Sequence, residues 1–319
     1  MELERRTFLK MTAATAVGFA WPAIAAEMEK RNDMPYRVLG KTGEKVSLLC
    51  LGGYHVGSGA LTDDEAVRII RTAIDEGVNF LDNAWQYNGG RSEERVGLAL
   101  KDGYREKVFL MTKHKGRDRQ TAQQHLETSL RRFQVDCIDL WQFHEVVHAG
   151  EPERIYTQGA IEFALEAKTQ GKIRYIGFTG HAVPELLNEM IDRGFNWDTV
   201  QMPLNCFDPH YTSFEKGVMP KALEKKIGVI AMKTLGGTPG QIPGTKIASI
   251  PECLHYAMNL PVSTVCSGID SMDKLRENLA AAKSFKPLTA EKVAELLERT
   301  RTAALEGRYE PYKSSWHRA

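Results

Sequence analysis

Several features that define large classes of proteins are missing from this sequence. No Cys-x-x-Cys pair occurs, which excludes a zinc ribbon and a cysteine-ligated iron–sulfur cluster. Positive charge is not in excess, because 42 Lys and Arg residues face 41 Asp and Glu residues, so the charge gives no support for a nucleic-acid partner. No Gly-x-Gly-x-x-Gly motif follows a predicted strand, which excludes a Rossmann dinucleotide site. An odd number of cysteines argues against a disulfide framework, the five being Cys50, Cys137, Cys206, Cys253 and Cys266.

Long apolar runs are also missing, and the first 26 residues have the pattern of a targeting segment. Arg5 and Arg6 precede a weakly apolar run, residues 11–21, which is shorter than the roughly 20 residues of a membrane span. A basic start, a short apolar run and a small-residue end are typical of a secretory signal, and the paired arginines resemble the twin-arginine signal. We therefore expect residues 1–26 to be such a signal peptide. The expected location is periplasmic or otherwise exported, with the twin-arginine export machinery as partner and no stable membrane anchor after cleavage.

The rest of the chain has the composition of a globular protein, with 42% hydrophobic and 26% charged residues. Short β-branched runs alternate with segments of helical period, and no Pro-, Gly- or Ser-rich linker divides them. The predicted strands are residues 46–51, 79–82, 108–113, 139–144, 173–179, 199–202, 229–233 and 263–267. Eight strand–helix units predict an α/β protein, a (β/α)8 TIM barrel that occupies residues 35–319 as one domain.

Local signals refine this fold. The segment 62–65 reads as a capping box that opens a helix, and Ser92 is predicted to cap a helix over 93–100. Residues 37–39 and 46 onward predict an N-terminal hairpin before the barrel, and residues 288–304 predict an extra C-terminal helix.

Three neighbouring strands end in groups that can do chemistry. Asp82, Lys113 and His144 stand at the C-terminal ends of the second, third and fourth strands, and Tyr87 follows Asp82 in the loop. In a (β/α)8 barrel these ends meet at one rim. A neighbouring lysine should lower the pKa of Tyr87, and an aspartate should keep that lysine charged. The four groups predict a proton donor and oxyanion site for the reduction of a carbonyl, with hydride from a cofactor.

These residues resemble the aldo-keto reductase family. Residues 80–94 are similar to its Asp-x-Ala-x-x-Tyr and Ser-Glu signature, and residues 108–113 and 139–144 are similar to its Lys and His segments. The resemblance implies that Tyr87 is the acid, that Lys113 and Asp82 tune it, and that His144 orients the carbonyl of a small-molecule substrate.

The same resemblance implies a nicotinamide cofactor bound in extended form over the rim. Its carboxamide would contact Thr179 and Gln201, and its phosphates the loop formed by Lys233, Thr234, Leu235, Gly236 and Gly237. Its adenosine end would lie near Lys274, Glu277 and Asn278. We expect NADP, with NAD accepted, because Lys274 is a candidate partner of a 2′-phosphate. Three positions depart from the family pattern: Gly180, Met232 and Gly268.

Alternative readings are open at this point. Each rim residue alone is compatible with a structural ion pair, a buried core histidine or a surface aromatic. The segment 144–148 matches the His-Glu-x-x-His motif of zinc hydrolases, although the Gly and Pro that follow leave little room for a helix, and we expect no metal site. A non-catalytic nucleotide-sensing or assembly subunit is the third reading. For an enzyme, an aromatic-walled substrate pocket is predicted from Tyr54, His55, Trp85 and Trp141.

Overall fold

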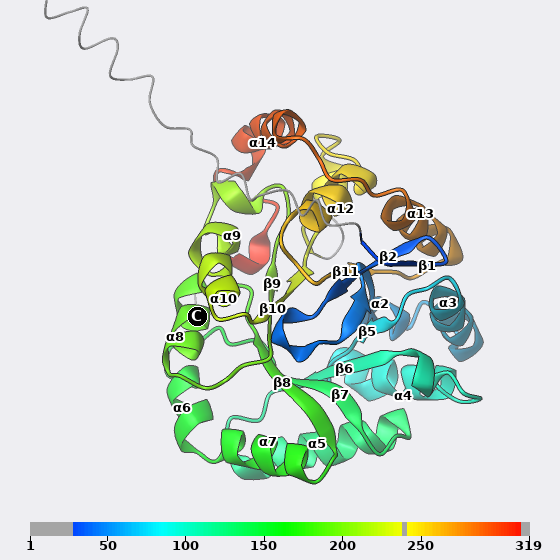
Figure 1. Cartoon of the computed structure of the whole chain (residues 1–319), viewed down its shortest axis with the longest axis vertical. Helices are drawn as coiled ribbons and strands as arrows, with labels where there is room; N and C mark the ends of the chain where they lie inside the picture. The colour runs from blue at the N-terminus through cyan, green and yellow to red at the C-terminus, as the bar shows by residue number, and fades with distance from the viewer. Residues whose placement is uncertain (1–27, 238–240, 314–319) are drawn as a thin grey trace, which may run out of the picture.

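Eight parallel strands close into a barrel in the order β10-β11-β4-β5-β6-β7-β8-β9, with helices around the outside (Figure 1). The computed structural model describes residues 28–237 and 241–313, apart from the side chain of Gln241. The barrel strands are β4 (Leu49–Gly52), β5 (Phe80–Asp82), β6 (Phe109–His114), β7 (Ile138–Phe143), β8 (Ile173–Thr179), β9 (Thr199–Pro203), β10 (Gly228–Met232) and β11 (Thr264–Gly268). The predicted (β/α)8 barrel is confirmed.

Helices follow the barrel strands, as the predicted strand–helix units require, and short helices that the sequence did not predict are added at residues 53–56, 151–157, 214–217 and 241–244. They are α2 (Gly53–Val56), α3 (Asp63–Asp75), α4 (Arg91–Ala99), α5 (Arg119–Phe133), α6 (Glu151–Thr157), α7 (Ala160–Thr169), α8 (Pro184–Asp192), α9 (Phe214–Gly217), α10 (Met219–Glu224), α11 (Gln241–Gly244), α12 (Ile250–Asn259), α13 (Met272–Lys283) and α14 (Ala290–Ala304). No helix in the two described ranges is both long and apolar enough to cross a membrane.

A small antiparallel sheet precedes the barrel, as the hairpin prediction requires. It consists of β1 (Lys30–Arg31), β2 (Met34–Val38) and β3 (Lys45–Ser47). Leu39 and Val46 from this hairpin pack among side chains of the barrel interior, such as Phe80 and Phe109. The apolar run predicted as one strand, 46–51, is therefore divided, because its first part pairs with the hairpin and its last part with the barrel.

The two predicted N-caps have different outcomes. The Thr62 hydroxyl accepts from the Glu65 backbone N–H while the Glu65 carboxylate accepts from the Thr62 backbone N–H, which confirms the capping box. Such a cap stabilises a helix by about 1 kcal/mol. The Ser92 prediction is wrong, because α4 begins earlier, with Gly90 in the left-handed conformation at its N-cap. Ser92 is buried inside the helix, and its hydroxyl donates to the carbonyl oxygen of Gly53 at 2.6 Å.

The C-terminal helix is present and is followed by an anchored segment. The Thr300 hydroxyl on α14 donates to the carbonyl oxygen of Cys206 at 2.9 Å. Beyond it, Lys313 in the 3-10 helix η5 (Pro311–Lys313) is fully buried and pairs with Asp208 at 2.7 Å and with Glu310 at 3.0 Å. These ion pairs hold the last described residues against the loops at the C-terminal ends of the strands.

Candidate active site

Asp82, Lys113 and Tyr87 form a chain of contacts at the C-terminal ends of β5 and β6. Lys113 Nζ donates to Asp82 Oδ1, to the carbonyl oxygen of Asn83 at 2.7 Å and to the Tyr87 hydroxyl oxygen at 3.2 Å. Lys113 is 1% exposed and Asp82 is 5% exposed. An ammonium held here, away from water, stabilises negative charge that develops on the phenol oxygen when its proton leaves.

The loop that carries Tyr87 is fixed by its neighbours in sequence. Tyr87 begins the 3-10 helix η2 (Tyr87–Gly90), in which Asn88 adopts a positive φ of 52°. The Asn88 side-chain amide donates to the carbonyl oxygen of Tyr54 at 2.7 Å, and the Tyr54 and Tyr87 rings meet edge to face at 5.4 Å. The phenol is therefore presented from a loop that is bonded to the first strand–helix turn.

Glu93, the second residue of the Ser-Glu motif, is a structural brace. Its carboxylate is fully buried and accepts hydrogen bonds from Thr112 and Ser129, each at 2.7 Å, and from Arg132 at 3.1 Å. Burial raises the pKa of Glu93, and these donors oppose the rise. The motif thus ties α4 to β6 and α5, which keeps the loops after β5 and β6 in fixed relation.

His144 lies directly after β7 and faces Tyr87. The two rings meet edge to face with centroids 5.8 Å apart, and His144 Nδ1 lies 3.2 Å from Gln86 Oε1. Burial, and then the charge of Lys113, hold the pKa of His144 well below its ordinary value. The imidazole is therefore neutral and has one N–H, and Gln86 determines which ring nitrogen carries it. The sequence reasoning missed Gln86, which only its place in the Tyr87 loop could have suggested.

The expected lowering of the Tyr87 pKa is not what the site produces. Burial raises the pKa of Tyr87 above that of a free phenol, and the opposing effect of Lys113 is smaller. For Lys113, burial acts to lower the pKa, but the Asp82 carboxylate and the Tyr87 oxygen outweigh it and the pKa rises. At neutral pH the pair is thus a protonated phenol beside a charged ammonium.

The second oxygen of Asp82 joins two more strands to the site. Asp82 Oδ2 accepts from Gln201 Nε2 at 2.8 Å and from the Cys266 thiol at 2.9 Å. Gln201 and Thr179 are paired in register on β9 and β8, so the two residues expected at a carboxamide are adjacent. The buried Gln201 Oε1 atom has no hydrogen-bond partner among the described residues. This oxygen is therefore a hydrogen-bond acceptor that is available to a ligand at the C-terminal ends of the strands.

Two of the three departures from the family pattern, Gly180 and Gly268, lie where the packing leaves little room for a side chain. A Cβ atom on Gly180 would lie 2.2 Å from a methyl carbon of Leu187 and 2.7 Å from the carbonyl oxygen of Val146, so no side chain fits there. A Cβ atom on Gly268 would lie 2.1 Å from the ring of His55. Met232 is half-buried at the end of β10.

The loop expected to hold phosphates follows β10 directly. Lys233, Gly236 and Gly237 all have positive φ, of 56°, 83° and 85°. A Cβ atom on Gly236 would lie 2.8 Å from Ile242, so that glycine is needed for close approach as well as for conformation. Lys233 Nζ lies 5.6 Å from the ring centroid of Tyr312, a residue of η5 that the sequence reasoning did not single out. Thr234 is buried and Leu235 is half-buried.

The residues expected at an adenosine group lie on α13 but have unequal exposure. Lys274 and Glu277 are exposed, and the Lys274 ammonium pairs with Asp270 at 2.7 Å. Asn278 is buried, and its amide donates to the carbonyl oxygen of Lys274 at 2.7 Å while its oxygen accepts from Ser267 at 2.7 Å. In this arrangement Asn278 links α13 to β11, and Lys274 and Glu277 are the groups open to a ligand.

One sequence-based prediction, the place of Trp141 in a substrate pocket, and one alternative, the zinc-hydrolase motif, do not agree with the structure. Trp141 is fully buried and stacks on His114 at 3.6 Å, so it does not line a substrate pocket. Residues 144–148, the His-Glu-x-x-His match, form an irregular loop between β7 and α6, so the two imidazoles are not placed one helical turn apart. Trp85 stacks on His125 at 3.8 Å and is half-buried, whereas Tyr54 is 47% exposed beside Tyr87.

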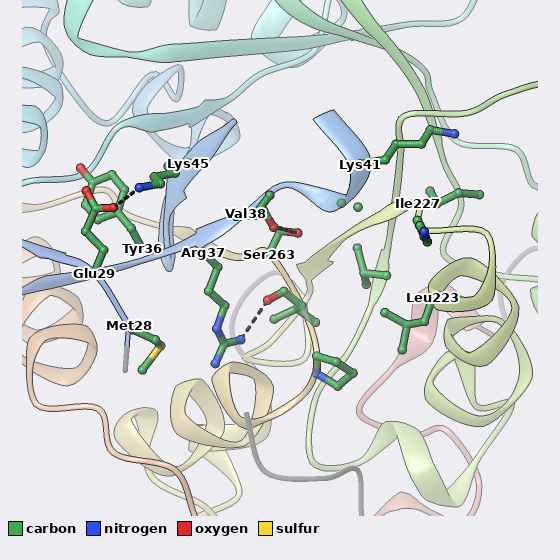
Figure 2. Close-up of a pocket in the computed structure, with 16 residues that line it drawn as sticks. Met28, Glu29, Tyr36, Arg37, Val38, Lys41, Lys45, Leu223, Ile227 and Ser263 are labelled. Atoms are coloured by element: carbon green, nitrogen blue, oxygen red, sulfur yellow. Dashed lines mark hydrogen bonds and ion pairs between the residues drawn. The ribbon is translucent and has the colours of Figure 1, made fainter. Parts of the chain in front are cut away.

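A hollow of about 550 Å³ lies at the opposite end of the barrel, beside the hairpin (Figure 2). Arg37 on its wall donates to the carbonyl oxygens of Met258, Leu260 and Val262 at 2.7, 3.0 and 2.9 Å, which ties β2 to the end of α12. None of the rim residues described above lines this hollow. The Arg37 guanidinium therefore has a structural role, and the candidate catalytic residues lie at the other end of the barrel, at the rim.

Comparison with known proteins gives the same picture. The profile of the "Aldo/keto reductase family" matches residues 48–248. The "Aldo-keto reductase YhdN" of Bacillus subtilis (strain 168) is 30% identical over 216 residues, which are 63% of this chain and 62% of that protein.

Two solved structures share the fold. The holo form of aldo-keto reductase AKR11C1 from Bacillus halodurans superposes with a TM-score of 0.71 at 24% identity, covering 87% of this chain and 99% of that one. An aldo/keto reductase from Klebsiella pneumoniae, in complex with NADP and acetate, gives a TM-score of 0.69 at 22% identity, covering 83% of this chain and 95% of that one.

Proposed function

Because this chain belongs to the aldo/keto reductase family and is thus an NAD(P)H-dependent oxidoreductase, we propose that it reduces the carbonyl group of an aldehyde, ketone or quinone, with Tyr87 as proton donor. The observation that carries this proposal is the contact of the Lys113 ammonium with the Tyr87 hydroxyl at 3.2 Å, backed by Asp82. That arrangement serves an acid whose conjugate base must be stabilised in a water-poor site.

The raised pKa of Tyr87 fits this role. A protonated phenol donates a hydrogen bond to the carbonyl oxygen and keeps its proton until negative charge develops on that oxygen. The alkoxide then formed is a stronger base than phenolate, so the proton moves to it, and Lys113 stabilises the phenolate that remains. His144, kept neutral by burial, can position the same oxygen through an Nε2–H, with the Gln86 amide turned so that its N–H donates to Nδ1.

The cofactor proposed is NADP, with NAD accepted, and several residues fit it. The unpartnered Oε1 atom of Gln201 can accept a hydrogen bond from a carboxamide, and Thr179 is next to it. The loop 233–237, with three residues at positive φ, can direct backbone N–H groups at phosphates. When bound, the reduced nicotinamide supplies the hydride. The NADP in the Klebsiella pneumoniae structure of the same fold supports this choice.

We assign residues 35–319 to the catalytic barrel and residues 1–26 to a twin-arginine signal, which lies outside the described residues. Export in the folded state would let the protein carry its cofactor with it.

The test is direct. Purified native protein is denatured and the released nucleotide identified, and refolded or fresh protein is then assayed for NADPH oxidation with simple aldehydes, ketones and quinones. Turnover of any of these carbonyls supports the proposal. Bound nucleotide without turnover would instead support a nucleotide-sensing subunit, and neither nucleotide nor turnover would contradict both.

A further inference from the structure

Two cysteines and the rim aspartate form a second chemical cluster directly beneath the site. The Cys50 and Cys266 sulfurs and a carboxylate oxygen of Asp82 all lie within 4.8 Å of one another. The Cys266 thiol donates to Asp82 Oδ2 at 2.9 Å. Cys50 is fully buried, whereas Cys266 is half-buried. The proposed reduction uses neither thiol.

Strand register brings these residues together. Cys50 on β4 is paired with Cys266 on β11, and Asp82 ends β5, the other neighbour of β4. Cys50 packs against the apolar interior of the barrel, and Cys266 lies against the same cluster. Since residues in register on adjacent parallel strands point to the same side, both thiols project inward below the Asp82 carboxylate.

We propose that Cys50, Cys266 and Asp82 form a binding site for a soft divalent cation such as Zn²⁺. Two thiolates and one carboxylate are a donor set that zinc accepts, with the fourth tetrahedral position left for water. Two sulfurs on one zinc ion lie about 3.8 Å apart, given a Zn–S distance of about 2.3 Å. The spacing of the cluster is compatible with that value.

The charge of the buried cluster supports binding. Without metal, the Asp82 carboxylate and the Lys113 ammonium cancel, and the protonated Cys50 and Cys266 thiols carry no charge. Binding removes one proton from each thiol to solvent and adds two positive charges. Zn²⁺, two thiolates, Asp82 and Lys113 then sum to zero again, so no net charge is buried. Because two protons leave, the apparent affinity should rise about a hundredfold per pH unit around neutrality.

Metal binding and the reduction share Asp82. An ion on Asp82 Oδ2 displaces the hydrogen bonds from Gln201 and Cys266 and withdraws negative charge from Lys113. We therefore infer that metal binding inhibits the reduction, because Lys113, which stabilises the Tyr87 oxygen, loses its counter-charge. This inference rests on the proposed function.

Co²⁺ is the spectroscopic probe for the site. Thiolate ligation produces charge-transfer absorption in the near ultraviolet and intense tetrahedral d–d bands. The full-length protein should bind one Co²⁺ with this spectrum, which Zn²⁺ abolishes by competition. The Cys266→Ser and Cys50→Ala variants should lose the bands and bind Zn²⁺ at least about tenfold more weakly. Circular dichroism is the control that tests whether each variant is folded.

Cys253→Ser is the matched control. Cys253 is also a fully buried thiol beside a second cysteine, Cys206, but no carboxylate completes that pair among the described residues. This variant should bind Co²⁺ like the wild type. Absence of thiolate absorption in the wild type, its persistence without Cys266, or its loss in Cys253→Ser would each overturn the site.

The activity measurement separates the two proposals. Zn²⁺ should inhibit NADPH oxidation in the wild type, and a chelator should restore it. Metal binding in a protein that reduces no carbonyl leaves the site standing and contradicts only the proposed function. Metal binding with unchanged turnover contradicts the inhibitory role.

Discussion

The hydroxyl of Tyr87 is the single group on which the proposed chemistry depends. It contacts Lys113 at 3.2 Å, its loop is fixed by Asn88, and burial raises the pKa of the phenol further above neutral pH. A phenylalanine at this position would keep the ring contacts with Tyr54 and His144 while removing the proton.

We predict that Tyr87→Phe lowers the rate of carbonyl reduction at least about a hundredfold, which is the lower end of the contribution of a general acid. Cofactor affinity, measured by fluorescence titration, should change little. Tyr54→Phe is the matched control, because its ring touches Tyr87 but its hydroxyl makes no contact with Lys113 in the structure. More than a tenth of wild-type turnover in Tyr87→Phe would mean that another residue is the acid.

His125 on α5 shows how burial of one residue links folding to pH. It is 9% exposed, stacks on Trp85, and burial, with Arg132 next, lowers its pKa to about 4. Between pH 6.5 and 4 the unfolded chain binds a proton that the folded protein does not. The free energy of unfolding therefore falls as pH falls through this window, by up to about 1.4 kcal/mol per pH unit.

We predict that His125→Gln removes this dependence. Urea unfolding at pH 7 and pH 5 should show a loss of stability between the two pH values that is smaller in the variant by about 1–2 kcal/mol. Loss of the stack on Trp85 lowers stability equally at both pH values and does not affect this difference. The same loss in variant and wild type would show that His125 titrates normally in the folded protein.

At the scale of whole elements, we expect α13 to determine the preference between NADP and NAD. Lys274 is the cation expected at a 2′-phosphate, but its ammonium is exposed and already pairs with Asp270. A lysine is a point charge without the bidentate fork of arginine, and one exposed contact contributes about 1 kcal/mol.

We predict that the protein prefers NADPH to NADH by only about five- to tenfold and that Lys274→Ala nearly equalises them. Asp270→Asn is the companion variant, which should increase the preference for NADPH because it removes the competing carboxylate. Titration of both dinucleotides into the three proteins measures the effect. A thousandfold preference that survives Lys274→Ala would place the phosphate site elsewhere.

The whole molecule combines a barrel with a predicted export signal. The twin-arginine route takes folded proteins, so we propose that a barrel exported by this route would carry its cofactor with it. The signal rests on Arg5 and Arg6, which lie outside the described residues.

We predict that changing Arg5 and Arg6 together to Lys retains the protein in the cytoplasm, folded and active. Lysine keeps the charge but lacks the planar guanidinium group that the twin-arginine signal requires. Cell fractionation followed by an activity assay on each fraction is the measurement. Normal export of the doubly substituted protein would indicate the route for unfolded chains.

The sequence by itself determined the barrel and three of its rim groups. The alternation of short strands and periodic helices specifies eight βα units because each element must bury one face, and Asp82, Lys113 and His144 are named by the strand ends that they occupy. Tyr87 and the capping box at Thr62 follow from local spacing, which the chain keeps wherever tertiary contacts agree with it.

Only the tertiary structure decided the rest, because the deciding contacts join residues that are distant in the chain. Burial outweighs Lys113 in setting the pKa of Tyr87, which proximity in sequence cannot show. Ser92 bonds to Gly53 instead of capping its helix, and Trp141 is buried against His114. Likewise Cys50 and Cys266 look unrelated along the chain, and they meet because closing the barrel makes its first strand the neighbour of its last.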